Sequence, residues 1–239
     1  MVGELADNLF APNSLDRVGP EAEKPIDLMR LDSSAALVHN VFDYWTGRDC
    51  QPIASACGMD AAEPMLKFSE LLPVAAAINE DMAPPIDVML TSSDAKPIAI
   101  VATLGEPYQL RKRGGTHGLE SLTQSGLWGP LQDCRALAVD HSASSRHYGR
   151  LQVSGLLKQC LALSNCYGPR GFRLLYLWFE VPGHASQELS REIDGFRMRV
   201  GGEVDFASCS WQTFFERFRP NCSEHLGYAA YLGSRYFEP

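Results

Sequence analysis

Apolar and polar residues follow two kinds of pattern along the chain, and together they predict its helices and strands. Apolar residues three or four positions apart are typical of helices with one buried face, whereas short continuous apolar runs are typical of buried strands. The helical pattern covers residues 32–46, 65–79, 151–163, 186–200 and 211–218, and the strand pattern covers residues 86–90, 97–104, 172–181 and 203–209. This order predicts an α/β fold in which helices flank a mixed central β-sheet.

The ends of these elements carry recognisable signals. Asp32 is the expected N-cap of the first helix and Gly47 its stop, while Ser210 is the expected N-cap of the last helix. Residues 86–90 and 97–104 flank a polar turn, which predicts a β-hairpin whose second strand is central in the sheet. We interpret residues 1–31 as an N-terminal arm and residues 48–64 as irregular. Residues 32–239 then form a single domain with a loop insertion at about 105–150.

Composition narrows the class of protein. The chain has 239 residues, of which 45% are hydrophobic, enough for a sizeable core and too many for a mostly disordered chain. Because no run of about 18 apolar residues lacks a charge, we expect no membrane span. The net charge of −8 argues against coating nucleic acid by bulk electrostatics.

Seven cysteines lack a CxxC pair, and no basic segment resembling a signal peptide opens the chain. This usage predicts reduced, mostly buried thiols and a cytoplasmic location. The tyrosines near the C-terminus have two interpretations. They cover an edge of the fold, or they form an interface in a homo-oligomer. They are Tyr228, Tyr231 and Tyr236.

Asp87 is the first candidate for chemistry, because it is a carboxylate inside an apolar strand. Alternation along an edge strand would turn it to solvent, which is the simple structural interpretation. The functional interpretation starts from the cost of burying an acid that has neither a partner nor a metal. An acid on one hairpin strand, followed by acid-x-Lys on the next, suits metal-dependent phosphodiester hydrolysis. The carboxylates hold Mg²⁺ and the lysine stabilises charge on the phosphate.

The stretch IDVMLTSSDAKPIAIVATLGEPY resembles the hairpin of the PD-(D/E)XK nuclease superfamily. More narrowly, it is similar to a bacterial restriction-endonuclease-like branch, whose second strand reads roughly I-E-S-K-F-T-E-P-Y. The segments LQVSGLLKQCLAL and LLYLWFEVPGHASQELSREIDGF resemble a helix and a strand-turn-helix of that branch, so the likeness runs from about residue 65 to 220. The resemblance implies a core of helix, three strands, helix and strand, and the predicted pattern is one strand short before Asp87.

The resemblance also implies a nuclease ancestry, with Mg²⁺ as cofactor and DNA as partner if the protein is active. Asp87 stands at the place of the first metal-binding acid, Val101 at that of the Glu and Thr103 at that of the Lys. Valine does not ligate a metal and threonine carries no positive charge. The motif is therefore degenerate, although the following Glu106-Pro107-Tyr108 matches the acid-Pro-Tyr of the branch.

Nearby groups are candidates to replace the missing ones. With Asp87 as metal ligand, a relocated catalytic set is Asp87, Glu106 and Lys158, and Glu70 on the predicted helix 65–79 is a further candidate ligand. Each has a structural alternative: a hydrogen-bonding acid at a strand end for Glu106, the rim of an amphipathic helix for Lys158, and a solvated helix position for Glu70.

A basic cluster, Arg111-Lys112-Arg113, follows the hairpin and is the candidate nucleic-acid-binding segment, joined by Arg146, His147 and Arg150. Its structural alternative is a solvated charged surface.

Three hypotheses follow. The chain is a catalytically impaired nuclease relative that acts by binding nucleic acid or protein, an active Mg²⁺-dependent DNA endonuclease with relocated groups, or a purely structural or interaction protein on the same scaffold.

Overall fold

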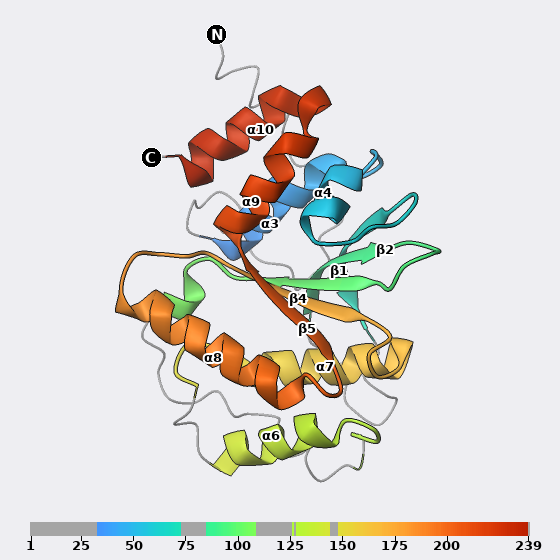
Figure 1. Cartoon of the computed structure of the whole chain (residues 1–239), viewed down its shortest axis with the longest axis vertical. Helices are drawn as coiled ribbons and strands as arrows, with labels where there is room; N and C mark the ends of the chain where they lie inside the picture. Colours follow the sequence, from blue (N-terminus) through green and yellow to red (C-terminus); the bar gives the residue numbers. More distant parts are fainter. Residues whose placement is uncertain (1–32, 73–84, 109–125, 127, 144–147, 239) are drawn as a thin grey trace.

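A mixed five-stranded sheet forms the centre of the protein, with strands in the order β1-β2-β3-β4-β5 (Figure 1). The computed structural model describes residues 33–72, 85–108, 126, 128–143 and 148–238. Strand β2 is antiparallel to both of its neighbours, β1 and β3, whereas β3, β4 and β5 run parallel to one another. The strands are β1 (Met65–Leu71), β2 (Pro85–Thr91), β3 (Ile98–Ala102), β4 (Arg173–Trp178) and β5 (Asp205–Ser210).

Helices cover both faces of this sheet, so the chain has the predicted α/β class (Figure 1). Helices α7 (Val153–Tyr167) and α8 (His184–Val200) pack on one face, with α6 (Gln132–Ala143) outside them. The other face is covered by α3 (Ser34–Phe42), α4 (Gln51–Ala56), α9 (Trp211–Phe218) and α10 (Leu226–Leu232). Short 3₁₀ turns include Asp43–Trp45 and Glu106–Tyr108.

The hairpin is confirmed, since β2 pairs with β3 from Leu90–Ile98 to Val88–Ile100. Strand β3 is the third of five and is also paired with β4, so its predicted central position is confirmed. Apolar residues on both faces of β3 follow from this position, because helices cover both sides. Met89 and Ala99 belong to the core on the α7 side, whereas Ile100 belongs to the core on the α3 side.

The prediction of a helix over Met65–Asn79 is wrong where the structure describes it, because Met65–Leu71 is strand β1. Leu66 and Phe68 pack against the core while Met65 and Lys67 are exposed, which is a period of two. The apparent helical spacing depended on Ala75 and Ile78, which lie outside the described residues. Pairing with β2 along the whole strand decides the conformation.

Most of the other elements form close to their predicted bounds, with local differences. Ser33, not Asp32, caps α3, since its hydroxyl accepts the N–H of Ala36. Ser210 caps α9 as predicted by accepting the N–H of Thr213 at 3.1 Å. Residues 48–64 are not wholly irregular, because α4 lies within them.

The described part of the insertion is anchored by two carboxylates. Glu203 accepts the N–H groups of Asp133 and Cys134 at the start of α6, a helix the sequence pattern did not predict. Glu192 of α8 accepts three consecutive N–H groups, those of residues 149–151, just before α7. Glu203 thereby compensates amide donors that have no partner within α6, whereas Glu192 binds amides of the segment that precedes α7.

The C-terminal tyrosines contact α3 of their own chain. Tyr228 is buried and its hydroxyl donates to the carbonyl oxygens of Asn40 and Val41. Tyr231 and Tyr236 bond the side chain of Asn40. These contacts fix α10 and the chain end on α3.

All seven cysteines are free thiols, and Cys166 is the one that is exposed. The others pack as small apolar groups, as expected. Among the described helices, none combines the length and the apolar character needed to cross a membrane.

Two histidines, the half-buried His39 and the buried His141, make stability depend on pH. Burial lowers the pKa of His39, which stacks on Phe68 of β1 with ring centroids 5.2 Å apart, and the nearby Asp43 opposes this shift. Burial also lowers the pKa of His141 in α6. Because the unfolded chain then binds more protons than the folded one, stability rises with pH around the ordinary histidine pKa of about 6.5.

We therefore expect the urea midpoint to fall as the pH drops from about 7 to 5, as the histidine pKa values dictate. The double variant His39→Gln/His141→Gln should show a weaker dependence than the unmodified protein. An identical dependence in both proteins would show that these histidines do not control acid sensitivity.

Candidate functional site

Asp87 lies where β2 and β3 separate. The ladder between them ends at Val88–Ile100, and the carboxylate of Asp87 then accepts the N–H of Ala102 at 2.8 Å. The side chain is half-buried and turned toward β3, not out to solvent as simple alternation allowed. Asp87 therefore takes the place of a main-chain acceptor at the fork between the two strands.

Val101 lies opposite Asp87 when the register of the hairpin is continued by one pair. It pairs with Tyr176 of β4 on its other side and packs against the apolar core beneath α7. The hairpin geometry thus brings residue 101 next to Asp87, as expected. An apolar side chain occupies the position.

Thr103 is buried in the junction between β3 and β4. Its hydroxyl lies 3.1 Å from the hydroxyl of Tyr176, and its N–H donates to the carbonyl of Leu177. Its own carbonyl accepts the indole N–H of Trp211. A cation in this place would lose most of its hydration, so the position favours the small neutral hydroxyl over a lysine.

Glu106 faces the α3 side of the fold. Its carboxylate accepts the hydroxyl of Ser34 at 2.5 Å and the N–H of Leu104 at 2.9 Å. These bonds tie the end of β3 to the first turn of α3. The contacts match the structural interpretation of Glu106 as a hydrogen-bonding acid at a strand end.

Helix α7 packs beside the start of β2, as the sequence led us to expect for the helix that carries Lys158. The amide of Gln159 donates to the carbonyl of Pro85 at 2.8 Å, two residues before Asp87. Lys158 itself is half-buried on this helix. The structure thus places the helix of Lys158 at the strand that carries Asp87.

Tyr108 closes the same end of the sheet. Its hydroxyl donates to the carbonyl of Phe179 at 2.6 Å and lies 3.2 Å from that of Ser186. Burial raises the pKa of Tyr108, although the bond to Ser186 opposes the shift. Tyr108 therefore remains a neutral group that joins the end of β3 to the start of α8.

The remaining candidates divide into two groups. Glu70 belongs to β1 opposite Ile86, not to a helix as we expected, and its side chain is outside the described part. Arg111, Lys112, Arg113, Arg146 and His147 also lie outside it. Arg150 is described, and its guanidinium bonds Glu188 at 2.8 Å and the carbonyl of Pro107. Arg150 lowers the pKa of Glu188 by this bond and holds α8 against the 3₁₀ turn.

Within the described residues, no group of three or more His, Cys, Asp or Glu side chains is placed to hold a metal ion. Comparison with known proteins adds no relative. No family model matches the chain, and no curated protein or solved structure resembles it significantly.

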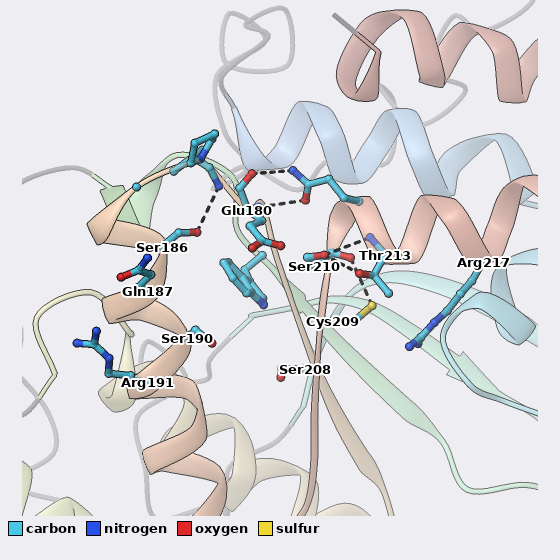
Figure 2. A pocket seen from close by; sticks show the side chains of 15 residues that line it. Glu180, Ser186, Gln187, Ser190, Arg191, Ser208, Cys209, Ser210, Thr213 and Arg217 are labelled. Carbon is cyan, nitrogen blue, oxygen red and sulfur yellow. Dashed lines mark hydrogen bonds between the residues drawn. The ribbon is translucent and has the colours of Figure 1, made fainter.

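The sequence pattern did not indicate every candidate site in the structure. A crevice lies between α8 and α9 at the carboxyl ends of β4 and β5 (Figure 2). The sequence does contain the polar residues that line this crevice, in the β4–α8 turn and at Ser208 and Ser210. These residues lie together only because of the directions in which the chain continues from β4 into α8 and from β5 into α9, and local sequence patterns do not predict those directions.

The bond from Asp87 predicts a stability effect at this position. Asp87→Ala should lower the free energy of unfolding by about 1–3 kcal/mol, because the N–H of Ala102 loses a partly buried acceptor. Asp87→Asn keeps an acceptor oxygen and should lose less than half as much. Urea unfolding measures both, with the exposed Glu224→Ala as control. Equal effects of Asp87→Ala and Glu224→Ala would contradict a structural role.

Proposed function

We propose that the protein is a restriction-endonuclease-like relative of the PD-(D/E)XK nucleases that binds nucleic acid without hydrolysing it. Strand order supports the scaffold. Three antiparallel strands are followed by α7 and by a fourth strand parallel to β3, with a helix before the first strand. This order of elements agrees with the superfamily core of helix, three strands, helix and strand. Strand β1 is the strand before Asp87 that the sequence pattern lacked.

The observation that carries the proposal is the fork at Asp87. The acid stands on β2 opposite residue 101 of β3, which is the arrangement that the resemblance requires. One oxygen of this carboxylate, Oδ2, accepts a main-chain amide. Valine and a buried threonine occupy the two neighbouring positions. Loss of each preorganised charged group costs about 3–4 kcal/mol of transition-state stabilisation, which favours binding over catalysis.

Nucleic acid is the ligand that the scaffold and the basic cluster favour. Arg111-Lys112-Arg113 begins soon after the 3₁₀ turn Glu106–Tyr108, so it follows the carboxyl end of β3 in the chain. With a net charge of −8, binding must depend on such a local cluster and not on overall charge. An active endonuclease and a purely protein-binding scaffold are distinguished by the two experiments below.

The first experiment rebuilds the acid pair. Val101→Glu places a second carboxylate opposite Asp87, and we expect it to bind Mn²⁺ at least about tenfold more tightly than the unmodified protein in isothermal titration. Val101→Gln is the neutral control and should bind no better than the unmodified protein. Addition of Asp87→Asn should abolish the gain. If Val101→Glu and Val101→Gln bind alike, the hairpin does not hold a metal pocket.

The same proteins should be tested on supercoiled plasmid with Mg²⁺ or Mn²⁺. The unmodified protein is expected to leave it intact. Nicking that disappears in Asp87→Asn or Lys158→Ala would overturn the proposal in favour of an active endonuclease with relocated groups.

The second experiment tests the ligand. We expect the unmodified protein to bind duplex DNA with an affinity that falls steeply with salt, because phosphate contacts release counterions. Arg111→Ala/Lys112→Ala/Arg113→Ala should weaken binding about tenfold or more and reduce the salt slope by roughly three. Arg170→Ala/Arg219→Ala/Lys96→Ala removes the same charge elsewhere as control. Absence of DNA binding would favour the protein-binding scaffold.

A further inference from the structure

A cavity of about 700 Å³ lies between α8 and the outer helix α6 (Figure 1). Its volume falls in the range of small-molecule sites, which is about 300–1,000 Å³. Apolar and aromatic lining residues come from α6, from α8 and from the segment that precedes α7, and they include Leu137, Ala143, Tyr148, Gly195 and Met198. An apolar lining with a few polar groups is typical of a site for a small molecule.

The walls of this cavity are joined to one another. The guanidinium of Arg199 in α8 donates to the carboxylate of Asp140 in α6 at 2.6 Å. Glu192 of α8 accepts the N–H groups of residues 149–151, directly after Tyr148. These contacts hold α6 and the segment before α7 against α8. A site formed in advance binds its ligand without a large ordering cost.

The charged residues around the cavity are balanced. The described lining contains two acids and two arginines, which are Asp140, Glu192, Arg191 and Arg199. Asp140 and Arg199 bind each other, and Glu192 binds main-chain amides. Arg191 acts on a neighbouring acid, since the pKa of Glu188 is lowered chiefly by its bond to Arg150 and in part by Arg191. An ion entering the cavity would lose water without meeting an unused opposite charge, so the lining favours an uncharged ligand.

Gly195 gives the α8 wall additional space. It lies within the 17-residue helix His184–Val200, where glycine is less favourable than alanine. A methyl group at this position would meet the hydroxyl of Tyr148 at 3.7 Å, which is an ordinary van der Waals contact. Packing within the described part of the chain therefore does not require a glycine here, and its missing side chain widens the cavity.

Two neutral polar groups in the lining have unused hydrogen-bonding capacity. His141 is 8% exposed, and its buried Nδ1 has no hydrogen-bond partner among the described residues. The ring of Tyr148 meets the His141 ring edge-on, with centroids 6.0 Å apart, and its hydroxyl forms no hydrogen bond within the same part of the chain. Native proteins leave few buried polar groups unpaired, so a molecule that supplies the missing bonds gains affinity.

Both groups stay uncharged near neutral pH. Burial lowers the pKa of His141, so its imidazole keeps one donor and one acceptor nitrogen. Burial also raises the pKa of Tyr148, although Arg199 opposes the shift, so the hydroxyl keeps its proton. Together they match a ligand that has both a donor and an acceptor.

Met198 adds a contact that suits a flat ring. Its side chain is 82% exposed although it lines the cavity. A thioether adapts to the shape of its neighbour and makes favourable contacts with aromatic rings. The edge-on pair of His141 and Tyr148 offers further ring contacts from the other elements.

From these observations we propose that the cavity between α6 and α8 binds an uncharged heteroaromatic molecule. Its ring contacts Met198 and Leu137, and its nitrogen atoms form hydrogen bonds with His141 and Tyr148. This inference goes beyond the proposed function, because the cavity contains neither the fork at Asp87 nor the basic cluster.

Isothermal titration of the full chain at about pH 8 tests the ligand class, with the donor and acceptor of neutral benzimidazole as the probe. We expect 1-methylbenzimidazole, which lacks the N–H donor, to bind at least about fivefold more weakly, since one hydrogen bond is lost. Benzimidazole-5-carboxylate keeps the ring and adds a negative charge. It should bind at least about tenfold more weakly, because the lining has no unused positive charge.

Gly195→Leu tests the place of binding. The added side chain enters the cavity and should weaken benzimidazole binding at least about tenfold, while the urea midpoint should not fall because leucine favours a helix. The matched control is Gly227→Leu in α10, where an added Cβ has open space, and it should change binding less than twofold. Tyr148→Phe removes the hydroxyl alone and should weaken binding about fivefold, which provides a second test if Gly195→Leu does not fold.

The proposal is overturned if benzimidazole does not bind at about 1 mM, or if the carboxylate derivative binds as tightly. It is also overturned if a folded Gly195→Leu protein binds as well as Gly227→Leu, or if Tyr148→Phe binds as well as the unmodified protein. Circular dichroism checks the fold of each variant. DNA binding is measured separately on the Arg111-Lys112-Arg113 variant, so this inference and the proposed function fail independently.

Discussion

The structure depends on the position of β3, which is antiparallel to β2 on one side and parallel to β4 on the other. The same strand that ends the hairpin begins the parallel half of the sheet. The hydrogen-bond pattern therefore differs between its two edges. At the carboxyl end of β3 the pairing with β2 stops, whereas the hydrogen bonds to β4 continue as far as Thr103. The N–H of Ala102 is left without a strand partner there, and Asp87 provides the acceptor. Any chemistry at the fork must share that carboxylate with the backbone.

The sequence patterns predicted the parts of the fold that depend on local signals. Ser210 as a helix cap needs a hydroxyl and a following apolar face, and both are visible in the residues themselves. Strand β1 was missed because its alternation spans seven residues at an edge, and its conformation is decided by pairing with β2, which is distant information. Helix α6 was missed although its buried residues have helical spacing, because the glycines and basic residues around it are typical of a loop; these buried residues are Cys134, Leu137, Ala138 and His141.

Some features of the candidate site could likewise be predicted from the sequence, and others could not. The hairpin register could be predicted, and it brings residue 101 opposite Asp87. The structural interpretation of Glu106 as a hydrogen-bonding acid matches its contacts, but its partner Ser34 could not be predicted, since Ser34 is 72 residues distant in the chain. The crevice could not be predicted from the sequence either, because it forms where α8 and α9 pack on different faces of the sheet and not at a sequence motif. Polar residues scattered over three elements carry no periodicity that would group them.

Helix α8 has adjacent residues with unrelated tasks. Glu192 holds the three amides that precede α7, and Arg191 is among the residues that line the crevice. Because one residue of an α-helix turns its side chain by about 100° relative to the next, as follows from 3.6 residues per turn, the two groups face different parts of the molecule. A small rotation of the helix about its axis would move both groups at once. The segment before α7 and the crevice beside β5 therefore depend on the position of one and the same helix.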